Sequence, residues 1–210
     1  DENVVKLVDE AENYFRKMPY KTPNYETKNG KTSVETEMGQ IPLKIFGKHN
    51  LLNLEGARLI CNQLGILDED FYEAMMSFSG ASKRLEKVKR NDDVILYRDF
   101  AHAPSKVKAS VDAFAEQFPA MKKIGVLELH TYSSLNPEFL PQYKNTLAQL
   151  DEAVVFYDLE ALKIKNMTPI SPELIKDSFG KENLQVFTNA DDLKNFWQNL
   201  EKSNAAFLMM

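Results

Sequence analysis

The fold class is decided by the stretch IGVLEL, residues 124–129, and by the polar segment HTYSS that follows it at residues 130–134. A short apolar run that gives way to polar residues is typical of a buried strand whose end meets solvent. Similar runs recur and alternate with helical patterns. Strands are expected at 85–90, 93–98, 124–129, 153–157, 184–188 and 205–210, and helices at 104–117, 137–149, 172–178 and 190–201. This alternation predicts an α/β fold, a Rossmann-like and mostly parallel sheet with flanking helices, whose ligands bind beyond the carboxyl ends of the strands.

The pattern before residue 78 is different. Residues 2–17 have the spacing of an amphipathic helix, and residues 25–46 contain short β-type runs, interrupted by Asn29-Gly30, that predict an antiparallel meander. Two helices are expected next, at 49–65 and 68–76. The segment FSGAS at 78–82 breaks the pattern and is interpreted as a hinge. The expected units are therefore 1–77 and 78–210.

Composition and charge exclude several classes of protein. Hydrophobic residues make up 43% of the 210 residues and aromatic residues 10%, which is enough for a packed core. The formal net charge of -5 leaves no basic surface for nucleic acid or for an anionic membrane. No apolar run approaches the ~18 residues of a membrane span. We therefore expect no nucleic-acid partner and no membrane.

Cys61 is the only cysteine, which excludes an internal disulfide and a thiolate zinc cluster and fits a reducing cytoplasm. The chain begins Asp1-Glu2-Asn3, without an initiator Met or a signal sequence, and ends in the apolar run AAFLMM. These features suggest a piece of a longer cytoplasmic protein.

The eight glycines also exclude a class of site. No two of them are closer than eight positions. A P-loop needs two glycines five residues apart followed by Lys, and a dinucleotide fingerprint needs three glycines within six residues. Neither phosphate-binding loop is present in this sequence.

Four short stretches carry residues suited to chemistry, and they contain all three histidines: GKHNLLN at 47–53, FSGASKRLE at 78–86, RDFAHAP at 98–104 and ELHTYSS at 128–134. Each has a structural explanation, because Asn50 can cap its helix, Asp99 can be a strand-end cap, Arg84 can pair with Glu86 as a solvated ion pair, and His102 can be an ordinary first-turn residue. The functional alternative is a nucleotide site. Amides pair with an adenine edge, a carboxylate accepts from ribose hydroxyls, and Arg with His faces phosphate oxygens.

Taken together, the four stretches resemble the Mur ligase family, whose motifs read H-N-x-x-N at a helix start, F-x-G-x-x-x-R-x-E at a domain junction, D-[FY]-[AG]-H-x-P after the next strand and His-Tyr-Ser/Thr after another. The resemblance covers nearly the whole chain. It implies the end of a central ATPase domain, 1–77, joined to a C-terminal Rossmann-like domain, 78–210, truncated at its end. The implied activity is an ATP-dependent ligase of peptidoglycan precursor synthesis or recycling, in which an amine attacks an acyl phosphate.

The resemblance also implies roles for individual residues. Asn50 and Asn53 match asparagines that contact adenine, and His102 matches a histidine near the phosphates and the incoming amine. The residues implied to bind ATP are His49, Asn50, Asn53, Arg84 and Asp99, and those implied to be catalytic are Arg84 and His102. The residues implied to bind substrate are His102, His130, Tyr132 and Ser133.

The fourth stretch departs from the family pattern. Members that add L-alanine usually read P-H-R-Y-[ST]-R, whereas Thr131 and Ser134 replace both arginines here. Muropeptide ligases read P-R-S-N, which does not match either. The acceptor joined to UDP-N-acetylmuramate, L-Ala or a peptide, therefore stays open.

The implied cofactors are ATP and Mg²⁺. The phosphate loop and the acidic Mg²⁺ ligands are expected in a part of the protein that this sequence lacks, so we expect no metal site here and an inactive isolated chain. The alternative is a non-catalytic, nucleotide-sensing or protein-binding α/β module. A hydrolytic set of Asp99, His102 and Ser133 is disfavoured because no G-x-S-x-G elbow occurs.

Overall fold

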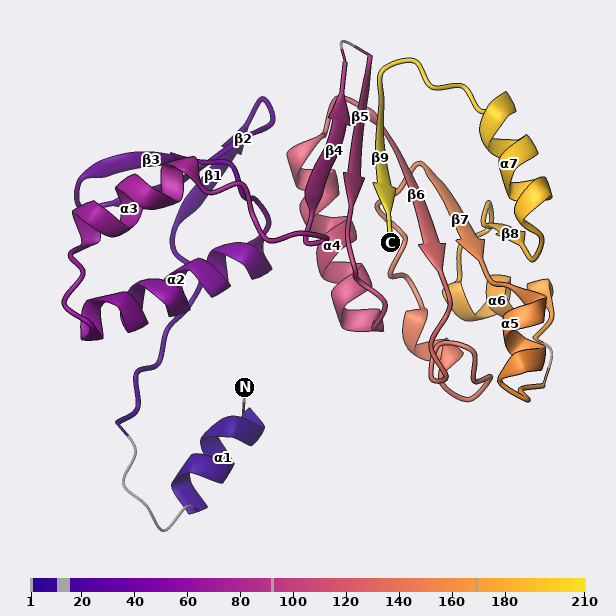
Figure 1. The fold of residues 1–210 in the computed structure, drawn as a ribbon, viewed down its shortest axis with the longest axis horizontal. Helices are drawn as coiled ribbons and strands as arrows, with labels where there is room; N and C mark the ends of the chain where they lie inside the picture. The colour runs from indigo at the N-terminus through magenta and orange to yellow at the C-terminus, as the bar shows by residue number, and fades with distance from the viewer. Residues whose placement is uncertain (1, 11–15, 92, 169) are drawn as a thin grey trace.

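The computed structural model describes residues 2–10, 16–91, 93–168 and 170–210. Its larger part is a six-stranded sheet in the order β4-β5-β9-β6-β7-β8 (Figure 1). Neighbouring strands from β5 to β8 pair in parallel, and β4 is antiparallel to β5. The strands are β4 (Glu86–Arg90), β5 (Val94–Arg98), β6 (Lys122–Glu128), β7 (Glu152–Phe156), β8 (Gln185–Phe187) and β9 (Ala205–Met209). The predicted α/β fold with a mostly parallel sheet is confirmed.

The last strand, β9, lies in the middle of the sheet, between β5 and β6 (Figure 1). Its residues face two hydrophobic clusters in turn: Ala206 and Leu208 belong to the large cluster on one face, and Ala205 and Phe207 to a smaller one on the other. Because both faces are covered, the strand is a continuous apolar run and not an alternating one. Trp197 of α7 (Ala190–Asn199) packs on Phe207 with ring centroids 4.9 Å apart.

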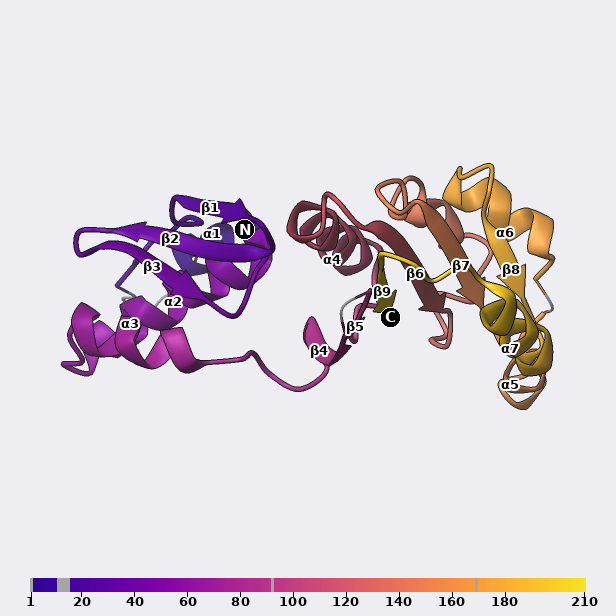
Figure 2. The same cartoon turned by 90° about the horizontal axis from the view of Figure 1, so that it is seen from above.

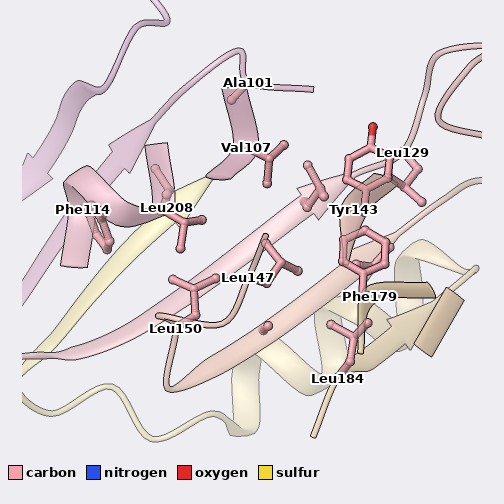
Figure 3. Close-up of a cluster of buried hydrophobic side chains, with 14 of the residues drawn as sticks. Ala101, Val107, Phe114, Leu129, Tyr143, Leu147, Leu150, Phe179, Leu184 and Leu208 are labelled. Carbon is pink, nitrogen blue, oxygen red and sulfur yellow. The ribbon is translucent and has the colours of Figure 1, made fainter. Parts of the chain in front are cut away.

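The large cluster lies under α4 (Pro104–Gln117) and α6 (Pro172–Phe179), which Figure 2 shows on the side of the sheet opposite α7. Figure 3 shows Phe114 of α4 and Leu208 of β9 at one end of this cluster and Tyr143 beside Phe179 at the other. The two rings of that pair stack with centroids 5.0 Å apart. The Tyr143 hydroxyl donates to the backbone oxygen of His102, so the core holds the loop that follows β5.

The prediction of a helix over 137–149 is wrong. The chain there forms a short 3-10 helix, η1 (Leu140–Tyr143), followed by turns. Pro141 has no amide hydrogen, and Asn145 has a left-handed backbone with φ of 62°, so an α-helix does not continue through this segment. Leu147 and Leu150 are nevertheless buried, because the turns pack on the sheet. A helix that the sequence analysis did not predict, α5 (Leu159–Ile164), follows β7.

The part before residue 78 contains α1 (Glu2–Glu10), a meander of β1 (Tyr25–Lys28), β2 (Lys31–Thr36) and β3 (Gly39–Leu43), and the helices α2 (Lys48–Gln63) and α3 (Asp68–Ser77). The meander is antiparallel, as predicted, and Asn29 and Gly30 both have positive φ in its first turn. Residues 11–15 of the expected first helix lie outside the described residues. Residues of β2, β3, α2 and α3 form a separate hydrophobic cluster that includes Val34, Leu51, Leu54, Phe71 and Tyr72.

The two parts of the chain meet on α4. Phe46 packs edge to face on Tyr97, with ring centroids 5.3 Å apart, and so joins the core of the sheet. Gln117 at the end of α4 donates to the backbone oxygen of Gly30 at 2.6 Å and accepts from the Thr32 hydroxyl at 3.0 Å. The division of the chain at residues 78–82 stays a prediction. The part before residue 78 has its own hydrophobic cluster, but Phe46 from that part packs in the large cluster of the sheet.

Gly47 is required at this contact for two reasons, and Gly39 provides a matched control. Gly47 has φ of 89°, and a Cβ there would lie 2.5 Å from Cβ of Ala113 on α4, whereas Gly39 has φ of 104° with open space around it. Gly39→Ala is expected to cost about 1–3 kcal/mol from backbone strain. Gly47→Ala is expected to cost about 1–3 kcal/mol more, because the α4 contact is overpacked. Urea unfolding of both variants measures the difference, and equal destabilisation would contradict this role of Gly47.

Candidate functional site

A cleft of about 680 Å³ lies between α2, α4 and the segment that joins α3 to β4. Its polar lining comes from all of these elements and from the end of β5: His49, Asn50, Asn53, Arg84, Asp99, Ser105, Lys106 and Ser110. Apolar side chains such as Leu54, Met75 and Phe78 complete the walls. All five residues expected to bind ATP thus line one cleft, although three separate stretches of sequence supply them.

Asp99 is the most constrained of these residues. Its backbone N–H donates to the Met209 oxygen at 2.8 Å, which places it directly after β5 beside the end of β9. One carboxylate oxygen accepts from the backbone N–H of Phe100 at 2.8 Å, and the other accepts from the Ser110 hydroxyl of α4. The N-cap residue of α4 is Ala103, so Asp99 is not a helix cap. Only 8% of Asp99 is exposed, and its carboxylate is therefore held in a fixed direction at the cleft.

Asn50 is likewise not the cap of its helix. The N-cap of α2 is Gly47, and the Asn50 amide donates backwards to the Phe46 oxygen at 2.9 Å. This bond orients the amide against the residue that crosses into the sheet core. Asn53 lies one turn further along α2, and its side chain is exposed at the same cleft.

His49 has a perturbed protonation equilibrium. Burial lowers the pKa of His49 below its ordinary value of 6.5, and the negative charge of Asp99 opposes part of that shift. The imidazole is therefore favoured in its neutral form at pH 7, when it can both donate and accept a hydrogen bond.

The loops after β5 and β6 bring three aromatic rings together. The His102 ring lies 5.0 Å from Phe100 and 5.9 Å from His130, measured between centroids, and Phe100 lies 6.1 Å from His130. The Arg84 guanidinium lies 5.8 Å from the centroid of Phe100. His102 and His130 are thus neighbours, as expected for residues after two strands of a parallel sheet. Arg84 lies beside Phe100 and also lines the cleft.

The segment after His130 is a compact turn. The Thr131 hydroxyl lies 2.9 Å from Oγ of Ser134 and accepts from the Ser134 backbone N–H at 3.1 Å, while Ser134 is buried. Ser133 is exposed, with its hydroxyl 3.2 Å from that of Thr131. Tyr132 projects to solvent with 65% of its surface exposed. None of the four residues expected to bind substrate is part of the lining of the cleft: His102, His130, Tyr132 and Ser133.

Sequence reasoning missed Ser110, Lys106 and Lys165. Ser110 holds Asp99, Lys106 lines the cleft, and Lys165 donates to the backbone oxygen of His130. No local pattern marks these residues, because each approaches the site from an element outside the four stretches or from a later helical turn.

Within the described ranges, no group of three or more His, Cys, Asp or Glu side chains is placed to hold a metal ion. None of the described helices has the length and apolar composition needed to cross a bilayer.

Known proteins are similar to most of this chain. No protein-family model matches it. The UDP-N-acetylmuramate--L-alanine ligase of Caldicellulosiruptor bescii is 32% identical over 149 residues, which are 71% of this chain and 31% of the relative. The chain spans about a third of the length of the curated relatives that it matches.

Solved structures share the fold. A UDP-N-acetylmuramate-alanine ligase from Thermotoga maritima has a TM-score of 0.67 at 17% identity, covering 89% of this chain and 40% of that one. A MurF ligase from the same organism, in complex with ADP, has a TM-score of 0.60 at 18% identity, covering 89% and 41%.

The shifted equilibrium of His49 gives a test of its proximity to Asp99. Asp99→Asn is expected to lower the pKa of His49 further, because it removes the charge that opposes the effect of burial. In the wild-type chain and in the variant, the contribution of His49 to the free energy of unfolding should fall as the pH drops below about 6.5. The imidazole of the unfolded chain then binds a proton more readily than that of the folded chain. NMR titration of the imidazole measures the shift, with Asp112→Asn on the exposed side of α4 as the control. An unchanged or higher pKa in Asp99→Asn would contradict the geometry.

Proposed function

We propose that this chain, which belongs to the Mur ligase family, supplies part of the ATP site of an amide-forming ligase of peptidoglycan precursor synthesis or recycling. The ligase joins L-Ala or a peptide to UDP-N-acetylmuramate through an acyl phosphate. The observation that carries this proposal is the convergence of His49, Asn50, Asn53, Arg84 and Asp99 on one cleft.

The α2 side of the cleft suits a nucleobase. The Asn50 amide uses one donor for the Phe46 oxygen, which leaves its second N–H and its carbonyl oxygen to pair with the adenine edge. Asn53 presents a second amide on the same wall, and the apolar side chains of Leu54 and Met75 can cover the faces of the ring. We assign adenine recognition to Asn50 and Asn53, with neutral His49 beside them.

The opposite wall suits the sugar and the phosphates. Each oxygen of the Asp99 carboxylate accepts one bond within the protein, and lone pairs remain for ribose hydroxyls. Arg84 is exposed at the cleft and carries a fixed positive charge with several donors for phosphate oxygens. In the proposed reaction Arg84 stabilises negative charge on the transferred phosphoryl group.

We assign the acceptor to the rings of His102 and His130, which lie beside Phe100. His102 and His130 are close enough to share a substrate, and the hydrogen bond from Tyr143 to the His102 backbone holds the loop in place. We assign His102 to the incoming amine, as a catalytic residue that touches it, and His130, Tyr132 and Ser133 to substrate binding.

Mg²⁺ fits this part of the site poorly. Asp99 is the only acidic side chain that lines the cleft among the described residues, and both of its oxygens already accept hydrogen bonds. Mg²⁺ needs near-octahedral oxygen ligands, usually with one or two carboxylates. The residues present bind and orient the nucleoside, and we propose that the metal ligands come from another part of the ligase.

Replacement of Asp99 tests the nucleotide role. Asp99→Asn in the ligase that contains this chain is expected to lower kcat/KM by ~10²-fold, the range for loss of one positioned polar group. Asn is preferred to Ala, since Ala would leave the Ser110 hydroxyl, 2% exposed, without its acceptor, at a cost of about 1–3 kcal/mol. Asp112→Asn on the same helix is the control and should behave as wild type. Normal turnover in Asp99→Asn would remove this residue from the site.

ATP binding by the isolated chain separates the ligase from the alternative, a non-catalytic nucleotide-sensing module. The chain has contacts for adenine and ribose but no Gly-rich phosphate loop, and preorganised phosphate and metal contacts provide most of the rate in phosphoryl transfer. We expect binding weaker than micromolar and no hydrolysis. Stoichiometric micromolar binding in calorimetry would favour the sensing module.

A further inference from the structure

Lys165 supplies a cation to a loop that has none of its own. The segment 130–134 carries no Lys or Arg, and Thr131 and Ser134 bond to each other. Lys165, the C-cap residue of α5, reaches this loop: its ammonium donates to the backbone oxygen of His130 and lies 5.1 Å from the ring centroid of Tyr132. No ion pair between described residues includes Lys165. Two of its three N–H donors therefore remain for an anion.

Lys165 and Arg84 lie at different places around the loops that follow β5 and β6. Arg84 lies over Phe100 and lines the cleft, whereas Lys165 contacts the His130 backbone and the Tyr132 ring. An amide-forming ligase that uses ATP holds three kinds of anion: the phosphates of ATP, the donor carboxylate that becomes the acyl phosphate, and any carboxylate on the acceptor. Arg84 lines the cleft assigned to ATP, whereas Lys165 lies beside His130, which is assigned to substrate binding. Lys165 is therefore placed for the acceptor carboxylate.

We propose that Lys165 binds the carboxylate of a free α-amino acid acceptor and thereby selects it over a peptide. This inference rests on the proposed ligase function. A free amino acid carries a carboxylate on the carbon next to its reacting amine, whereas a peptide carries an uncharged amide there. A charge-assisted bond to a half-buried ammonium distinguishes the two, because the neutral acceptor leaves the cation without a counter-charge.

The test compares two acceptors that differ only in this charge, L-alanine and L-alaninamide, in the whole ligase. Lys165→Met keeps the apolar stem and removes the cation. It is expected to raise the KM for L-alanine about 10- to 100-fold, the range for one hydrogen bond to a charged group. The KM values for L-alaninamide and ATP should stay unchanged. Lys165→Arg should retain most of the preference for L-alanine.

Lys163→Met is the matched control, because Lys163 lies on the same helix, is exposed and pairs with Glu160. It should behave as wild type. Equal losses for both acceptors in Lys165→Met would mean that Lys165 only supports the His130 loop, and would overturn the inference. Turnover of a peptide but not of L-alanine by the wild-type ligase would also overturn it, while the proposed ligase function survived. Absence of amide formation with both L-alanine and a peptide would overturn the proposed function itself.

Discussion

The pairing of β9 with both β5 and β6 is the constraint on which the site depends. Two strand spacings separate β5 from β6 by about 10 Å. At the carboxyl ends, the backbone N–H of Asp99 donates to the Met209 oxygen, and the backbone N–H of Glu128 donates to the Met210 oxygen. The loops after β5 and β6 therefore start at a set distance, which the rings of His102 and His130 bridge. The last strand in the chain thus decides how two loops far earlier in the sequence meet.

Buried contacts then give each loop its direction. Ser110 holds the Asp99 carboxylate, and Tyr143 holds the His102 backbone, in both cases from within the core or its edge. Such bonds are costly to lose, since a buried polar group without a partner keeps its full desolvation penalty. On the other side of the cleft, close packing of Gly47 on Ala113 brings the start of α2 against α4. The sheet and its helix α4 therefore also position residues of the part before residue 78.

The sheet could be predicted because its strands are continuous apolar runs, as strands covered on both faces must be. The prediction of a helix over 137–149 was wrong because the apolar residues of these buried turns happen to be spaced as on a helix. Pro141 and the left-handed backbone of Asn145 prevent a continuous α-helix in this segment. The sequence marked Asp99 as a candidate site residue, but it did not mark its partner Ser110, because only the path of α4 brings the two side chains together.

The sequence by itself determined the α/β class and the antiparallel meander and marked four stretches suited to nucleotide chemistry, because local apolar periodicity and residue type carry that information. Only the tertiary structure decided that α2, the segment before β4 and the end of β5 share one cleft. It also decided that Lys165 provides the cation of the loop after β6. The physical reason is that side chains from separate elements converge through strand order and close packing, and neither can be read from residue spacing along the chain.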